Sequence, residues 1–279
     1  MLAIGASNFR YFAQDQGSGF AAATPGRTIT ASASANTKGS WTLHHAAAAI
    51  TFDVDLVFVN IGGNSANGVD ARALHDIGFD PAGGTAYGVV IPNLLGGCTA
   101  AGIAGGFQQY WFPVHIPAGS TIASRMQCAT GSRTSSVSVI CCGGNRVPGS
   151  FWKGTGVDAL GVDTANSKGT TFTPGNTAYG SYTSIGSTTT RPYRWLDFGT
   201  QGPFTGSTWG ALGYLAHLAF QSGGIIGPVR TWSTNAQEAS SYGLHLPWPV
   251  EVPEASQLQV RGGCSGTAVA QDCAIYGVY

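Results

Sequence analysis

The chain has 279 residues with 13 basic and 13 acidic side chains, so its formal net charge is zero, and only 9% of its residues are charged. An average soluble protein carries roughly 25% charged residues, so neutral polar groups must cover much of this surface. This balance excludes a basic stripe for nucleic acid and an acidic tract for cations. The 42 glycines, together with abundant Ser and Thr, indicate strands joined by many turns. The N-terminal segment lacks a signal-peptide pattern and no apolar run is long enough to span a bilayer, so we expect no membrane insertion.

Residues 1–38 are predicted to form an extended N-terminal arm, in which aromatic side chains are spaced among Gly, Ser and Ala. The arm has too few apolar residues for a core of its own, so we expect it to lie along a neighbouring surface. Residues 39–145 form the first predicted domain, where short apolar runs alternate with turn signals. Its predicted strands are 41–44, 54–60, 89–92, 110–116, 121–127 and 135–141, and 71–77 is either a strand or a helical turn.

Residues 146–175 are rich in Gly and Thr and are predicted to form a linker. Residues 176–279 form the second predicted domain, with strands at 193–198, 212–220, 225–231, 242–252, 257–262 and 268–276. Several short strands in each domain and no strong helix predict an all-β chain of two tandem, jelly-roll-like β-sandwiches.

The two predicted domains resemble each other in sequence. Residues 110–125 (YWFPVHIPAGSTIASR) and 246–261 (LPWPVEVPEASQLQVR) align at one constant offset, which places Pro117 on Pro253 and Arg125 on Arg261. Shorter matches join 24–26 to 173–175, 39–42 to 180–183 and 74–84 to 215–224. A repeat of about 140 residues has the length of a domain and not of a solenoid unit, so we predict an internal duplication. Because the arginine recurs in both copies, we expect a structural ion pair or backbone clamp there.

The six cysteines are Cys98, Cys128, Cys141, Cys142, Cys264 and Cys273. No CxxC pair occurs, so a zinc site is not expected. Cys128 with Cys141 or Cys142, and Cys264 with Cys273, are predicted at the ends of equivalent hairpins and are candidates for cross-strand disulfides. Buried free thiols are the alternative, and oxidation after release from a cell is a third interpretation.

No pattern of a catalytic or cofactor site is present: GxSxG, HExxH and Walker motifs are absent from the sequence. Asp53 and Asp55, with Asp70, Asp76 and Asp80, lack the spacing of a calcium loop and are expected to be turn carboxylates. The seven tryptophans either fill cores and subunit contacts or form a glycan-stacking face. We therefore expect no enzyme activity, no cofactor and no bound metal.

The runs TPGRTITASASANTKG (24–39), LHDIGFDPAGG (74–84), VVIPNLLGG (89–97) and WFPVHIPAGSTIASRMQ (111–127) resemble a family of tailed-bacteriophage virion proteins. The resemblance covers most of the first domain and, through the repeat, part of the second. It implies a structural protein on the particle exterior, such as a decoration, collar or tail-fibre component, assembled in the host cytoplasm and then carried on the extracellular particle. The expected partners are further copies of the chain and other capsid, neck or tail proteins.

The alternative from another class is a carbohydrate-binding adhesin that recognises a host surface glycan. A polysaccharide-degrading enzyme is the third hypothesis, and it has no acid pair in the sequence to support it.

Overall fold

The computed structural model describes residues 11–14, 26–64, 70, 72–96, 107–144, 152–201, 212–220, 224–225, 230–235, 238–240, 248–264 and 270–279. Within these ranges the regular structure is β-strand apart from one 3-10 turn, η2 (Ala47–Ala49). The prediction of an all-β chain of sandwich type is confirmed. None of the described segments contains a helix long and apolar enough to cross a membrane.

The first sandwich consists of two antiparallel sheets. Sheet I has the order β1 (Tyr11–Gln14), β9 (Thr134–Gly143), β4 (Val54–Asn64) and β7 (Phe107–Phe112), with β2 (Arg27–Thr30) also on β9. Sheet II has the order β3 (Thr42–His45), β8 (Thr121–Cys128), β5 (Ala73–Asp80) and β6 (Gly88–Gly96). Along β9 the buried core residues Val137, Val139 and Cys141 alternate with outward residues, as the period of a strand requires.

The second sandwich has the same plan. Sheet III has the order β10 (Val157–Leu160), β21 (Gln271–Val278), β14 (Tyr193–Gln201) and β19 (Trp248–Val252), with β11 (Thr170–Phe172) also on β21. Sheet IV has the order β12 (Gly175–Asn176), β20 (Leu258–Cys264), β15 (Leu212–Phe220), β17 (Arg230–Asn235) and β18 (Glu238–Ser240). The short strands β13 (Thr183–Ser184) and β16 (Gly224–Ile225) pair with β20 and β15.

Strand order and pairing register correspond between the two sandwiches. On β5 and β8, Asp76 lies opposite Arg125, and on β15 and β20, His217 lies opposite Arg261. The strand pairs β3–β8 and β13–β20, β4–β9 and β14–β21, and β4–β7 and β14–β19 keep corresponding registers as well. The descent of both halves from one duplicated ancestor stays a prediction.

One match made in the sequence is wrong. Residues 24–26 were paired with 173–175, yet β2 places Ile29 opposite Ser135 and β11 places Phe172 opposite Gln271. The offset that places Pro117 on Pro253 also places Ser135 on Gln271, so their partners Ile29 and Phe172 correspond. Residues 24–26 therefore come before β2, whereas residues 173–175 follow β11. Thr-Pro-Gly is a common turn sequence, so its recurrence does not fix a register.

The predicted arm and linker contribute strands to the two sandwiches. β1 and β2 lie within residues 1–38 and pair with β9, and β10 and β11 lie within residues 146–175 and pair with β21. These strands are only three or four residues long. Such segments have a weak pattern of their own and become strands through pairing with a neighbour.

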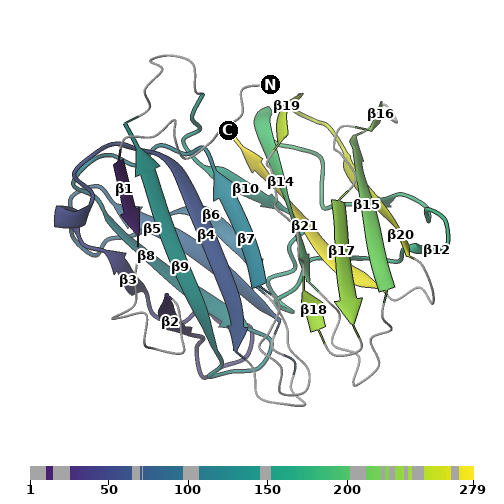
Figure 1. Ribbon diagram of the computed structural model, residues 1–279, viewed down its shortest axis with the longest axis horizontal. Helices are drawn as coiled ribbons and strands as arrows, with labels where there is room; N and C mark the ends of the chain where they lie inside the picture. Colours follow the sequence, from purple (N-terminus) through teal and green to yellow (C-terminus); the bar gives the residue numbers. More distant parts are fainter. Residues whose placement is uncertain are drawn as a thin grey trace.

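Sheet III joins the two sandwiches because both of its faces are buried. Along β21, Ala274, Tyr276 and Val278 belong to the core of the first sandwich, whereas Cys273 and Ile275 belong to the core of the second. Every residue of β21 is buried. Sheet III accordingly lies between the first sandwich and sheet IV (Figure 1). The two halves therefore form one block with two cores.

Neutral amide side chains cross the seam between the halves. Gln127 Nε2 donates to the carbonyl of Thr164 at 2.6 Å, and Gln201 Nε2 donates to the carbonyl of Gly96 at 2.9 Å. A third amide, that of Gln108, donates to a carbonyl of β14. These amides satisfy buried carbonyls without bringing a charge into the interior, where an unpaired charge would be costly.

The hairpins predicted to carry the disulfides do not form. Cys128 ends β8 in sheet II, whereas Cys141 and Cys142 lie on β9 in sheet I, because the connection 129–133 crosses from one sheet to the other. Cys264 and Cys273 are likewise on β20 and β21 of different sheets. All five are buried free thiols, and Cys98 lies outside the described residues. Burial raises the pKa of the Cys142 thiol to about 12, which keeps it in its unreactive protonated form.

Two turns at corresponding positions share one hydrogen bond. Ser120 Oγ donates to the carbonyl of Pro117 at 2.7 Å, and Ser256 Oγ donates to the carbonyl of Pro253 at 2.8 Å. The third residue of each turn is left-handed: Gly119 has φ +80° and Ala255 has φ 60°. Alanine is strained in this region because its Cβ approaches the carbonyl oxygen.

We predict that Ala255→Gly raises the free energy of unfolding by about 1 kcal/mol, because glycine adopts a positive φ without this clash. The reverse change, Gly119→Ala, is the matched control. Its added Cβ would meet no atom within 4 Å, so only the strain of a positive φ acts, and stability should fall by a similar amount. Urea unfolding of both variants measures the effect. Changes of the same sign in the two variants would contradict the prediction.

His75 is a second point where the fold makes a measurable prediction. The ring is fully buried, with Nε2 2.6 Å from Ser135 Oγ, and burial lowers the pKa of His75 from 6.5 to about 3. Because the unfolded chain takes up the proton first, the stability contributed by neutral His75 is complete above pH 6.5 and is lost as the pH falls towards 3. Between pH 7 and pH 5 the loss is about 2 kcal/mol. Replacing the residue, His75→Gln, should remove that part of the slope in denaturant titrations at pH 5, 6 and 7, whereas an unchanged slope would refute the assignment.

Candidate binding surface

The outer face of sheet II carries a cross-strand row of small and apolar residues, of which the two at the ends are exposed. Leu43, Ala123, Gly78 and Val89 lie opposite one another on the four strands of this sheet. Directly opposed residues share a face of the sheet. Leu43 and Val89 are each 44% exposed and are the exposed large hydrophobic side chains of the described surface. Trp41 lies over Gly78, where a Cβ would come within 2.7 Å of the indole.

Beside this row lies the first cluster, formed by Lys38, Trp41, Asp76, Tyr87 and Arg125. The rings of Trp41 and Tyr87 are 5.3 Å apart, and the Arg125 guanidinium lies 4.6 Å from the centre of the Trp41 ring. Asp76 accepts hydrogen bonds from Lys38 Nζ at 2.7 Å and from Arg125 Nε at 2.9 Å. Desolvation lowers the pKa of Lys38, and Asp76 acts against that shift. The Asp76 carboxylate is buried, so this cluster is an internal ion network covered by the indole ring of Trp41.

The second cluster lies on the outer face of sheet IV and consists of Tyr179, Tyr182 and Arg261. The Arg261 guanidinium is 4.9 Å from the Tyr179 ring centre and 4.6 Å from that of Tyr182. The match of 39–42 with 180–183 and the pairing registers put Tyr182 at the position of Trp41, and Arg261 at that of Arg125. All three side chains of the second cluster are half-buried.

The two clusters differ in their charged members. Tyr179 stands at the position of Lys38, and His217 stands opposite Arg261 where Asp76 stands opposite Arg125. The lysine and the aspartate of the first cluster are thus both replaced in the second. The arginine and its aromatic neighbour are common to both halves.

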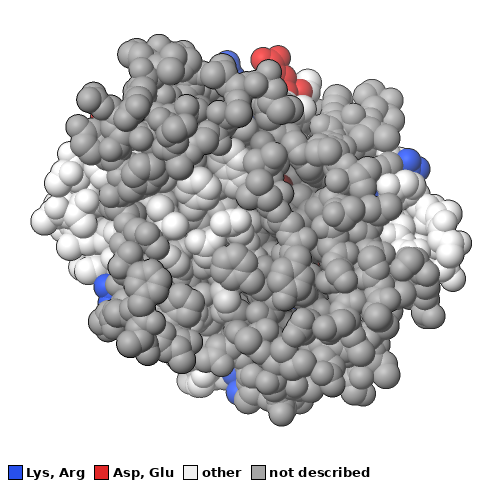
Figure 2. Space-filling view, viewed as in Figure 1, with Lys and Arg blue, Asp and Glu red and all other residues white. Residues whose placement is uncertain are grey.

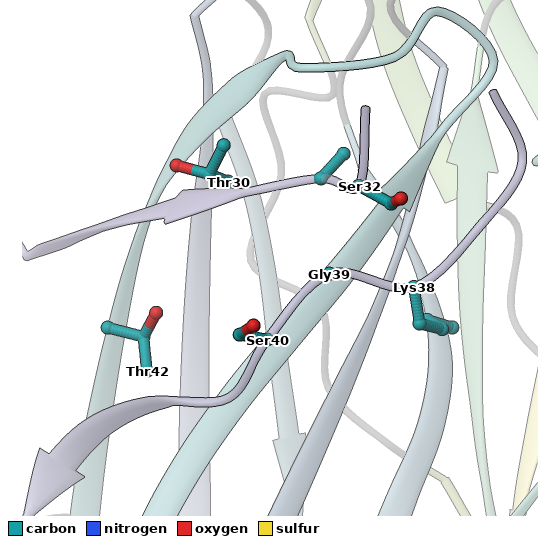
Figure 3. Close-up of a pocket in the computed structure, with 7 residues that line it drawn as sticks. Thr30, Ser32, Lys38, Gly39, Ser40 and Thr42 are labelled. Atoms are coloured by element: carbon teal, nitrogen blue, oxygen red, sulfur yellow. The ribbon is translucent and has the colours of Figure 1, made fainter. Parts of the chain in front are cut away.

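A hollow of 420 Å³ lies at the edge of the first sandwich, between the end of β2 and the segment that leads into β3. In Figure 3 its polar side chains come from these two segments. It is lined by Thr30, Ala31, Ser32, Lys38, Gly39, Ser40 and Thr42. Apart from Lys38, whose ammonium group is bound to Asp76, the lining is uncharged, so the hollow offers hydroxyl groups and no acid–base pair.

The aspartates considered as calcium ligands do not converge. Asp53 accepts the N–H of Ala118 at 2.9 Å, Asp55 pairs with Lys153, and Asp70 pairs with Arg72. Asp80 caps a turn and Asp76 belongs to the first cluster. Across the described segments, no three His, Cys, Asp or Glu side chains are placed to hold a metal ion. The carboxylates serve as structural ties.

Two histidine–serine pairs that the sequence did not predict lie inside the first sandwich. His44 Nε2 is 2.7 Å from Ser124 Oγ, and His75 Nε2 is 2.6 Å from Ser135 Oγ. All four side chains are buried, with at most 5% exposure. A polar substrate would not reach these hydroxyls, and the pairs serve to satisfy buried polar groups.

Charged side chains are sparse on the surface. On the face shown in Figure 2 the charged residues among the described atoms are few and lie apart. The described part of this face therefore shows no continuous acidic or basic patch that would steer a charged macromolecule.

No family model matches the chain, and no curated protein matches it in sequence. Among solved structures, the chain is similar to PNGF-II with 9% identity and a TM-score of 0.34, covering 90% of this chain and 65% of that one. It is also similar to an archaeal virus protein with a triple jelly-roll fold (10% identity, TM-score 0.22, 90% of this chain and 59% of that one). A third similar structure is the CBM22-1–CBM22-2 tandem of Xyn10C from Paenibacillus barcinonensis (8% identity, TM-score 0.24, 84% of this chain and 79% of that one). The chain thus spans less than two thirds of the first of these, and likenesses this weak carry no argument about function.

We predict that Asp76→Asn lowers the free energy of unfolding by about 3 kcal/mol or more, because it leaves two cationic groups without their buried counter-charge. Asp53→Asn is the control: this exposed side chain keeps an oxygen for the N–H of Ala118, so the change should stay within about 0.5 kcal/mol. Thermal and urea unfolding provide the readout. Equal effects at the two positions would contradict the ion network described for the first cluster.

Proposed function

We propose that the protein is a non-enzymatic structural component of a bacteriophage virion, exposed on the particle as a capsid decoration, collar or fibre protein. The observation that carries this proposal is that the aspartate carboxylates are bonded to other groups of the same chain. Every aspartate with a described side chain accepts a hydrogen bond or ion pair from a backbone N–H, a hydroxyl, an amide or a cation of the same chain. Groups tied in this way serve the framework rather than a reaction.

The fold also supports a building-block role. Sheet III is buried on both faces, so the two sandwiches form one unit that can transmit mechanical force. The exposed pair Leu43 and Val89 supplies an apolar strip for a neighbouring subunit. A surface with so few charges gives little mutual repulsion, which suits a protein held in an assembly of its own copies and other virion proteins.

The second candidate function is that of a carbohydrate-binding adhesin that recognises a host surface glycan. It is favoured by the aromatic–arginine clusters on the outer faces of sheets II and IV and by the hydroxyl-lined hollow beside β2. Aromatic rings with a polar neighbour offer the mixed apolar and hydrogen-bonding contact that sugar rings require.

The structural role predicts that purified particles contain the chain in a fixed copy number and that antibodies against it label the particle exterior in electron micrographs. The double variant Leu43→Ser, Val89→Ser should fold normally and enter particles less efficiently, because it removes the apolar strip. Glu254→Gln, in the exposed turn that precedes Ser256, is the control and should be incorporated like the unchanged protein. Purified particles that lack the chain would count against the structural role. Incorporation unaffected by the double variant would count against the apolar strip as a subunit contact.

A further inference from the structure

We infer that the hollow between β2 and the segment leading into β3 is a binding site for a neutral saccharide, held by the hydroxyl groups of Thr30, Ser40 and Thr42. This inference rests on the second candidate function, saccharide binding, and gives that function a place and a ligand class. The two aromatic–arginine clusters play no part in it. The apolar strip is separate as well, because Thr42 and its neighbour Leu43 point to opposite faces of β3.

The walls of the hollow are fixed by backbone hydrogen bonds. β2 belongs to sheet I and β3 to sheet II, and the segment 31–41 that joins them lies against residues 126–133. The bonds between these two segments, each 2.7 or 2.8 Å long, run from the N–H of Ala31 to Arg133, of Asn36 to Cys128, of Gly39 to Met126 and of Ser132 to Ser32. The hollow is therefore formed before any ligand arrives, as binding sites for small molecules usually are, and little conformational entropy is lost on binding.

The hydroxyl groups come from two extended segments that lie side by side (Figure 3). The segments approach so closely that a Cβ at Gly39 would clash with the carbonyl oxygen of Thr30. Ser40 and Thr42 are two residues apart, the spacing at which side chains of an extended segment point the same way. Among the described residues, no group of the chain bonds to the hydroxyls of Thr30, Ser40 and Thr42, whereas the hydroxyl of Ser32 accepts the N–H of Ser34 at 3.2 Å. Three hydroxyls of the lining are therefore open to a ligand.

The lining selects a ligand without charge. Its charged member is Lys38, whose Nζ donates to Asp76 at 2.7 Å and to the carbonyl of Leu74 at 3.2 Å. The ammonium group is thus held in the first cluster, where its counter-charge is a carboxylate with only 4% exposure. The lining offers no unpaired cation to a sugar acid or a phosphate, and no carboxylate to a cationic ligand.

A hydroxyl lining of this kind matches a sugar. The hydroxyl of serine or threonine both donates and accepts, so it can bond to a sugar hydroxyl in either direction. The methyl groups of Thr30, Ala31 and Thr42 add apolar contact for the C–H groups of a sugar ring. The volume of 420 Å³ lies near the lower end of the range of about 300–1,000 Å³ for small-molecule sites, which suits the terminal units of a glycan.

The test is saturation-transfer NMR on the full-length chain with the methyl glycosides of glucose, galactose and mannose. Three control ligands separate the features of a neutral sugar: methyl glucuronoside adds a carboxylate, glycerol supplies hydroxyls without a ring, and blocked trialanine supplies peptide groups. We expect one or more of the neutral glycosides to bind more tightly than each control. Absence of binding by all three neutral glycosides, or equal binding of any control, would overturn the assignment to a neutral saccharide.

Threonine-to-valine variants locate the site, because valine keeps the shape of threonine and lacks its hydroxyl. Thr30→Val and Thr42→Val should each weaken binding of the best glycoside about fivefold, the equivalent of roughly 1 kcal/mol for one neutral hydrogen bond. Thr28→Val is the matched control, since Thr28 is exposed on the same strand as Thr30 and does not line the hollow. It should leave binding unchanged.

A measurement on the unchanged protein gives the same information without a substitution. The methyl signals of Thr30 and Thr42 should shift during the titration, and that of Thr28 should not. A glycoside that binds equally well to the Thr30 and Thr42 variants and moves neither methyl signal would refute the hollow and place saccharide binding elsewhere on the chain. Absence of binding by every glycoside would count against the hollow and the second candidate function together, whereas the structural role is tested by particle incorporation and depends on neither result.

Discussion

The arrangement of the molecule depends on β21, which supplies alternate side chains to two different cores. Tyr276 faces the first sandwich, where its hydroxyl accepts the N–H of Leu95 at 2.8 Å, and Ile275 faces the second. A slip of one residue would exchange these two side chains and place a phenol in an apolar core. Burial raises the pKa of Tyr276, so the hydroxyl stays protonated and donates to the carbonyl of Asn93. Two cores and these hydrogen bonds therefore fix one register, and the positions of both sandwiches follow from it.

The low charge content and the polar seam are connected. A seam of salt bridges would require each charge to be desolvated, and that cost often cancels the attraction between the partners. Amides of Gln108, Gln127 and Gln201 instead donate to carbonyls across the seam and carry no charge. The ion pair between Arg72 and Asp272, at 3.3 Å, joins a guanidinium that is 18% exposed to a carboxylate that is only 1% exposed. Because the amides do not titrate, their part of the contact between the halves does not depend on pH.

Much of the fold could be predicted from the sequence, and the parts that could not have physical reasons. The alternation in β9 identifies a strand with one buried face, and the repeated Pro–Ser turns mark corresponding positions. By contrast, β21 lacks alternation because both its faces are buried, so its sequence does not reveal the second partner. Turn residues at 129–133 suit a hairpin and a crossing between sheets equally, which is why the disulfide prediction failed. The buried glutamines were missed because this residue type is usually exposed.

The two clusters show how a repeated framework acquires different surfaces. The stack of an aromatic ring on an arginine is common to both, at 4.6 Å for Trp41 with Arg125 and for Tyr182 with Arg261. Removing Asp76 alone would leave two cations facing each other, whereas exchanging Asp76 and Lys38 together for neutral groups keeps the net charge of the site unchanged. The second half has this combined exchange. The framework therefore tolerates the exchange of both charged partners of its arginine, and it keeps the aromatic ring on the guanidinium in both halves.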